Sequence, residues 1–316
     1  MAYRILPGEL VQEGIQRIAR EQIDKAIDEL DDDEVGRHET VHQVRKRCKK
    51  IRGLIRLVRP KFEATYKREN AWYRDAARPL SYVRDAQALV ETFDDLTEHF
   101  QDQIDEREIA EVRRELTDRR RRIAEDEVGL RERLDEFREL LLEGRERVAA
   151  WRVKDDEFDA VEGGLRKTYA RGRMTMRKAF EDPQTESFHE WRKRTKYHWY
   201  HMRLLRLTWE GPQKARRDAA DLLSDLLGDD HDLSILRRTL LERPDNFGEE
   251  RTIQSLIGLI NQRQVELRTQ ARTLGARIYA EKEKHYCRRQ RIYWKAWRRE
   301  TDVRPKARHA PELVTA

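Results

Sequence analysis

Cysteine, glycine and proline are scarce in this chain of 316 residues. Its two cysteines, Cys48 and Cys287, lie far apart, and neither has a partner at metal-ligand spacing, so neither a disulfide framework nor a zinc site is indicated. The 14 glycines and 8 prolines leave few helix breakers. Glu, Arg, Leu and Ala, which lose little freedom in a helix, are abundant. The composition therefore predicts an all-α protein in a reducing compartment.

Long apolar runs are also missing. No segment approaches the roughly 18 apolar residues of a membrane span. Residues 1–16 lack an apolar core of signal-peptide length. We therefore expect a soluble, cytoplasmic protein that does not enter a membrane.

Charged side chains of both signs are unusually abundant in this chain. Charged side chains make up 41% of the residues, with 67 basic and 61 acidic ones, which is well above the usual share in a soluble domain. The formal net charge is only +6, so a basic site must be local. Between residues 101 and 152 acids and bases alternate almost without pause, a pattern typical of exposed helices with i, i+4 pairs.

Prolines divide the chain into segments with helical spacing of apolar residues. They stand at positions 60, 79, 183, 212 and 244, where a helix can end or begin without losing a hydrogen bond. The spacing predicts helices at about 9–30, 38–59, 61–76, 80–98, 102–152 (broken near Gly129), 155–181, 185–209, 213–228, 230–242, 249–275 and 277–300.

A basic motif occurs twice, 147 residues apart. HQVRKRCK begins at His42, and HEWRKRTK begins at His189. The same offset, without a gap, aligns Leu80 with Leu227, and register is kept over some 45 residues in each copy. This predicts duplicated helical bundles, in which two antiparallel multi-helix halves, 1–150 and 151–316, are related by an internal repeat.

Each copy carries a stripe of basic residues along one side of a helix. In the first copy, the stripe residues are separated by steps of 3, 4, 3, 4 and 3 positions. The first stripe is His42, Arg45, Lys49, Arg52, Arg56 and Arg59, with Lys46 beside it, and the second is His189, Arg192, Lys196, Trp199, Arg203 and Arg206, with Lys193 beside it.

An apolar row runs beside each stripe, one position earlier, so the cations are expected to border the buried face of the helix. The rows are Val41, Val44, Cys48, Ile51, Ile55 and Val58 in the first copy, and Phe188, Trp191, Thr195, His198, Met202 and Leu205 in the second.

The stripes suit a phosphate chain. Like charges at i, i+3 and i, i+4 cost roughly 0.2–0.5 kcal/mol per pair, and no carboxylate is interleaved along either stripe. A polyanion would remove this repulsion, whereas a solvated basic face is the structural alternative. Successive donors rise about 5 Å per turn, and arginine offers bidentate contacts to phosphate oxygens. A phosphate would also favour the imidazolium form of the two leading histidines.

These motifs resemble the conserved histidine α-helical domain, or CHAD, family over nearly the whole chain. In that family each half has a histidine followed by basic residues three, seven and ten positions later. HQVRKRCKKIR matches fully, whereas HEWRKRTKYHW has Trp199 at the last position. YVRDAQAL, with Arg84 and Asp85, and LLGDDHDLSIL, with His231 and Asp232, resemble the family's second signature.

The resemblance implies binding of inorganic polyphosphate in a basic channel or groove where the two halves meet. Asp85 and Asp232 are expected to be structural, as internal partners that cap or orient the basic helices. A location on polyphosphate or storage granules is a further hypothesis, and protein partners stay unknown. The residues expected to bind polyphosphate are His42, Arg45, Lys46, Lys49, Arg52, Arg56, His189, Arg192, Lys193, Lys196 and Arg203.

No catalytic motif accompanies the stripes. Many relatives are fused to a triphosphate tunnel metalloenzyme, whose alternating glutamates this chain lacks. A glycine-rich phosphate loop, a magnesium carboxylate set and a Ser, His, Asp pattern are missing too. We therefore expect a binding module, not an enzyme, without metal or cofactor.

Two alternatives stay open. The segment HYCRRQRIYWKAWRRE, which starts at His285, mixes bases with aromatics and would suit nucleic acid, although its aromatics are more typical of a helix core. A phosphoanhydride-processing enzyme would need a metal site that the sequence does not indicate.

Overall fold

The computed structural model describes residues 3–32, 34–125 and 127–303, and every regular element in this part of the chain is a helix. The predicted all-α class is confirmed. The α-helices are α1 (Val11–Leu30), α2 (Arg37–Leu57), α3 (Glu63–Ala76), α4 (Ser81–His99), α5 (Glu106–Ala124), α6 (Glu127–Val148), α7 (Glu157–Glu181), α8 (Thr185–Leu204), α9 (Glu210–Glu242), α10 (Glu250–Ile278) and α11 (Glu283–Val303). Short 3-10 helices cover Gln101–Gln103, Arg206–Thr208 and Pro244–Asn246.

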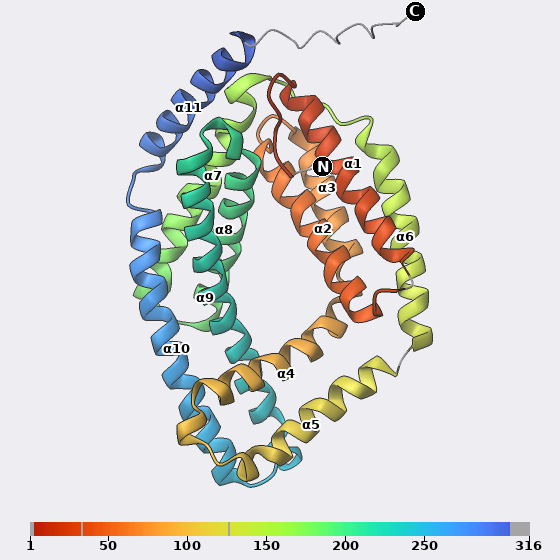
Figure 1. Ribbon diagram of the computed structural model, residues 1–316, viewed down its shortest axis with the longest axis vertical. Helices are drawn as coiled ribbons and strands as arrows, with labels where there is room; N and C mark the ends of the chain where they lie inside the picture. The colour runs from red at the N-terminus through yellow and green to blue at the C-terminus, as the bar shows by residue number, and fades with distance from the viewer. Residues whose placement is uncertain (1–2, 33, 126, 304–316) are drawn as a thin grey trace, which may run out of the picture.

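The helices form two groups that flank the middle of the molecule (Figure 1). In one group α1 packs on α2 and α6, and α2 packs on α3. In the other, α8 lies between α7 and α9, with α10 on α9 and α11 on α7. α4 leaves the first group to pack on α9 and α10, while α2 packs directly on α7 and α8. The two basic helices, α2 and α8, therefore meet.

Most helix bounds agree with the spacing of apolar residues, but one predicted break is wrong. Residues 213–228 and 230–242 belong to a single helix, α9. The Asp230 carboxylate at the expected break accepts hydrogen bonds from Arg268 (2.6 Å) and Gln264 (3.2 Å) of α10, so a partner far along the chain holds this segment helical. Pro212 lies in the first turn of α9, where its missing N–H has no helical partner to lose.

The other expected breaks exist, with shifted positions. The break predicted near Gly129 lies between Ala124 and Glu127. α10 continues to Ile278, and α11 begins at Glu283, so their junction is four residues long and starts later than predicted. The predicted boundary between the two halves falls in the connection between α6 and α7, and the division into two repeats stays a prediction.

The two apolar rows beside the stripes are buried, as predicted. No member of either row is more than 1% exposed, which places one whole side of α2 and of α8 in the core. The buried residues are Val41, Val44, Cys48, Ile51, Ile55 and Val58 on α2, and Phe188, Trp191, Thr195, His198, Met202 and Leu205 at α8.

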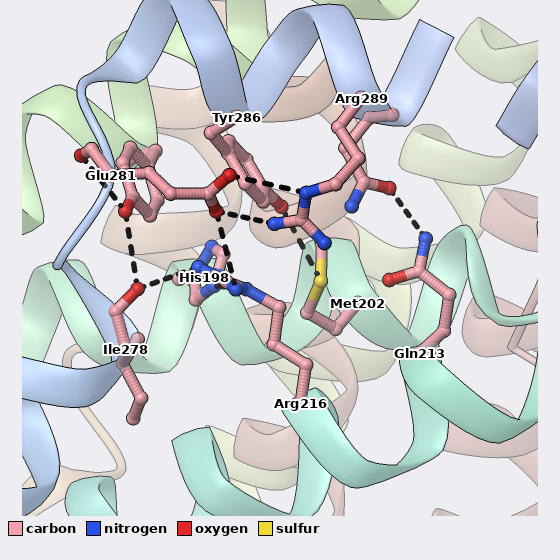
Figure 2. Close-up of polar contacts among 10 residues, drawn as sticks. His198, Met202, Gln213, Arg216, Ile278, Glu281, Tyr286 and Arg289 are labelled. Carbon is pink, nitrogen blue, oxygen red and sulfur yellow. Dashed lines mark hydrogen bonds and ion pairs between the residues drawn. The ribbon is translucent and has the colours of Figure 1, made fainter. Parts of the chain in front are cut away.

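A partly buried polar network connects the junction between α10 and α11 to the second group (Figure 2). Arg216 of α9 donates to the Ile278 carbonyl (2.6 Å) and to Nε2 of His198 (3.3 Å). Burial, and then Arg216, hold the pKa of His198 well below its usual value, so its ring is neutral and can accept this bond. Arg289 pairs with Glu281 in the same network. His198 is thus a structural residue of the core.

Two glycines let α2 approach its neighbours closely. A Cβ on Gly53 of α2 would lie 2.9 Å from the Cβ of Tyr200 on α8. A Cβ on Gly164 of α7 would lie 1.8 Å from the Leu57 carbonyl oxygen, at the end of α2. These distances leave no room for a side chain, so glycine sets the spacing at both contacts.

We predict that Gly164→Ala destabilises the protein by about 1–3 kcal/mol or more, because the new methyl group would meet rigid backbone. Gly258→Ala is the matched control: it changes another helical glycine, where no atom lies within 4 Å of the added Cβ. That change should stabilise by about 0.5–1 kcal/mol. Urea unfolding of the three proteins measures both effects. Equal unfolding free energies for the two variants would contradict the close contact.

Candidate functional site

The two stripes come together near the middle of α2 and α8. Lys196 of α8 lies close enough to Lys49 of α2 to disfavour its charge, as do Arg45, Arg192 and Arg84. The Lys49 side chain is exposed to solvent, yet the surrounding protein, and then these cations, lower its pKa to about 8. We call the five residues Lys49, Lys196, Arg45, Arg192 and Arg84 the stripe junction.

Carboxylates from α4 and α9 border the stripe junction. Burial raises the pKa of both Asp85 and Asp232, while Arg45 favours the charged form of Asp85 and Arg192 that of Asp232. Lys49 favours the charge of both. Each aspartate therefore lies beside the basic helix of its own half. The sequence predicts that it is a structural partner of that helix, and this role stays a prediction.

Residues related by the 147-residue offset meet each other at this place. Lys196 acts on Lys49, Gly53 contacts Tyr200, and Asp232 raises the pKa of Asp85. A contact in which equivalent residues face one another is what a two-fold arrangement produces. The predicted repeat would explain why both stripes reach the same point.

The surroundings of the stripe histidines disfavour their charged form and lower their pKa values. Burial, and then Arg84, lower the pKa of His42, which lines a cavity of about 340 Å³ with Arg84 and Glu91. The His189 ring packs on that of His231, with centroids 4.2 Å apart. Burial and neighbouring cations lower the pKa of each to about 4. A nearby phosphate would have the opposite effect, since it favours the charged imidazolium.

Neutral groups hold the cations of the first stripe. Arg45 donates to the Ala77 carbonyl (2.7 Å). Arg56, only 9% exposed, donates to Tyr66 and Asn70 (both 2.9 Å) and lies 4.1 Å from the Tyr197 ring centroid. Within the described chain, no carboxylate oxygen lies within 4.0 Å of a side-chain nitrogen of His42, Arg45, Lys46, Lys49, Arg52 or Arg56.

The second stripe differs, because acids accompany its cations. Lys193 pairs with Glu190, and Lys196 approaches Asp221 at 3.3 Å.

Trp199, which interrupts the row of cations in the second stripe, is itself in contact with two of them. Trp199 is 9% exposed, and its ring centroid lies 4.0 Å from Lys196 Nζ and 4.7 Å from the Arg203 guanidinium carbon. Trp199 therefore separates two cations and holds both by cation–π contact.

Two residues near the stripes were not among the predicted ligands. Arg84 lies close to Lys49 and His42 and pairs with Glu91 at 2.6 Å. His231 packs on His189. The 147-residue offset relates Arg84 to His231, and each stands directly before its aspartate. The repeat in the sequence could therefore have indicated both residues as further predicted ligands.

Neither a metal-binding cluster nor a membrane-spanning helix occurs among the described residues. No group of three or more His, Cys, Asp or Glu side chains there could hold a metal ion. Among the described helices, none combines the length and apolarity that a membrane crossing requires.

The sequence of this chain matches a known domain family. The family model described as CHAD domain matches residues 17–241, which run from α1 into α9 and include both stripes. Among curated proteins, no sequence matches this chain.

The low pKa of Lys49 gives a test of the stripe junction. We predict that Lys196→Met raises the pKa of Lys49 from about 8 toward the ordinary value of 10.5, because a repelling cation is removed. The pH dependence of Lys49 acetylation, followed by mass spectrometry, measures this shift. Lys193→Met is the control on the same helix, since Lys193 is paired with Glu190. An unchanged titration in Lys196→Met would mean that the stripes do not meet.

Proposed function

Because this chain belongs to the CHAD domain family, we propose that it binds inorganic polyphosphate at the stripe junction. The observation that carries the proposal is the meeting of two cation rows at Lys49 and Lys196. A phosphate chain there would restore the charge of Lys49 and relieve the repulsion among its neighbours. The predicted ligands from both stripes supply the binding groups.

The length of the stripes favours a chain over a single phosphate. From Arg45 to Arg56 the helix rises about 16 Å, at about 1.5 Å per residue. The arginines of this row are held by neutral partners such as Tyr66 and Asn70, so their orientation does not depend on a competing carboxylate. A flexible polyanion can follow such a row and place successive phosphates against it.

Nucleic acid is the alternative polyanion, but three of the four Tyr and Trp side chains of the C-terminal basic segment lie in the core, whereas Tyr293 is half-buried against the exposed Trp209. Tyr286, Trp294 and Trp297 of α11 are buried, as expected for helix core. They therefore cannot present ring faces to bases without unfolding the helix packing. Polyphosphate needs no such surface.

We further propose a cytoplasmic location, with polyphosphate or storage granules as the source of ligand. The two cysteines, Cys48 and Cys287, are free and buried, which fits a reducing compartment.

We predict that Lys49→Ala together with Lys196→Ala weakens polyphosphate binding at least tenfold, since each charged contact contributes roughly 1.5–3 kcal/mol. The salt dependence of affinity should also become shallower. Arg114→Ala with Arg121→Ala removes the same charge from the exposed helix α5 and is the matched control. Calorimetric titration at several salt concentrations measures both changes.

Competition by single- and double-stranded DNA and RNA at one fixed salt concentration separates the ligands. Polyphosphate should displace nucleic acid and not the reverse. A preference for nucleic acid, or equal losses in the two double variants, would contradict a specific polyphosphate site.

We also propose that the protein binds polyphosphate without processing it. Incubation with Mg²⁺ and polyphosphate should therefore release no phosphate above a protein-free control, as measured by a colorimetric phosphate assay. Sustained turnover that disappears in the Lys49→Ala, Lys196→Ala variant would establish the phosphoanhydride-processing enzyme instead.

A further inference from the structure

A second group of cations lies where the end of α2 packs on α7. Arg59 is the second residue after the end of α2, and Lys167 and Arg171 lie one turn apart on α7. We call these three, together with Arg56, the α2–α7 basic cluster. Arg59 lies ten residues beyond Lys49, or about 15 Å along the helix direction, and Arg56 connects the cluster to the cation row of α2.

The position of Arg59 is fixed by close packing on both sides. Leu57 meets Gly164, where an added Cβ would lie 1.8 Å from the Leu57 carbonyl oxygen. Pro60 meets Gly163, where an added Cβ would lie 2.7 Å from the proline Cγ. The segment that carries Arg59 is therefore set firmly against α7.

The cations of the cluster act on one another. Burial, together with the charges of Arg171 and Arg56, lowers the pKa of Arg59 to about 10, and the Tyr66 hydroxyl opposes this shift. The charge of Arg59 is the main cause that lowers the pKa of Lys167, and burial and the charge of Arg171 lower it further. His201 of α8 lies fully buried beside Arg59, and burial holds its pKa at about 3, so it stays neutral. These mutual effects place the cations close together.

Carboxylates are missing from the cluster within the described chain. None of its four cations has a carboxylate oxygen within 4.0 Å, whereas buried or half-buried arginines elsewhere, such as Arg47 and Arg268, have such partners. Arg59 is only 7% exposed, and its Nε and Nη2 have no hydrogen-bond partner among the described residues. Lys167 is exposed and Arg171 half-buried, so solvent reaches the cluster from the α7 side.

We propose that the α2–α7 basic cluster is a second anion site, which binds a phosphate group between Arg59, Lys167 and Arg171. Lys167 and Arg171 supply accessible donors, and Arg59 supplies a buried positive charge behind them. The phosphate comes either from free orthophosphate or from a polyphosphate chain that extends beyond the stripe junction. In the second case the inference rests on the proposed function.

The test uses Lys167→Ala with Arg171→Ala, two substitutions on one helix that favour helix formation. Titration calorimetry with orthophosphate and with long polyphosphate measures binding. We expect orthophosphate binding to fall more than tenfold in this variant. It should persist in Lys49→Ala with Lys196→Ala, which leaves the cluster intact. Long polyphosphate should bind the cluster variant several-fold more weakly if the chain reaches the cluster, and equally well if the site takes free phosphate.

Two controls accompany the test. Arg166→Ala with Arg173→Ala removes two charges from exposed positions of the same helix and should leave both ligands bound. Lys167→Arg keeps the charge and should retain orthophosphate binding. Unchanged affinity of the cluster variant for both ligands would overturn the second site. Loss of polyphosphate binding only in the stripe-junction variant, with orthophosphate affinity unchanged in the cluster variant, would overturn it too, while leaving the proposed function in place.

If the cluster variant loses long polyphosphate and the stripe-junction variant does not, the second site stands and the proposed function at the stripe junction fails. Equal losses in the cluster and control variants would show only general charge attraction and would also overturn the second site.

Discussion

The close crossing of α2 with α8 and α7 determines where the charges of this protein lie. Gly53 and Gly164 allow backbones and large side chains to touch at positions where a methyl group would not fit. Because the apolar rows of both basic helices are buried next to these contacts, the neighbouring cations are carried toward one another. The repulsion that results at Lys49 is thus a consequence of core packing, offset by the favourable burial of apolar side chains.

Periodicity in the sequence was sufficient to predict the local structure of the site. The steps of three and four residues placed both apolar rows on the buried sides of their helices. They could not show that the segment around Gly228 and Asp229 continues as helix, because the reason lies in α10, where Arg268 and Gln264 bind Asp230. A pattern along one helix contains no information about such a partner.

The same limit applies to the assembly of the charged groups. Arg84 and His231 share the repeat offset and could have been added to the predicted ligands from the sequence. Lys167 and Arg171 could not, because they share no spacing with Arg59 and reach it only through the contact between Leu57 and Gly164. The carboxylates beside Lys196 are likewise a product of how α9 packs on α8.

The carboxylates beside Lys196 are the main difference between the two stripes in the structure, and the sequence indicates a different one. From sequence, the second stripe is weakened by Trp199, an aromatic residue among cations. In the structure Trp199 holds Lys196 and Arg203 by cation–π contact, so it supports their orientation. The difference lies instead in the partners. A phosphate at Lys196 must compete with Asp221, whereas a phosphate at Arg56 meets a guanidinium oriented by the neutral groups of Tyr66 and Asn70. Because exchange of one anion for another gains less than neutralisation of an unpaired cation, α2 should contribute more of the binding free energy than α8.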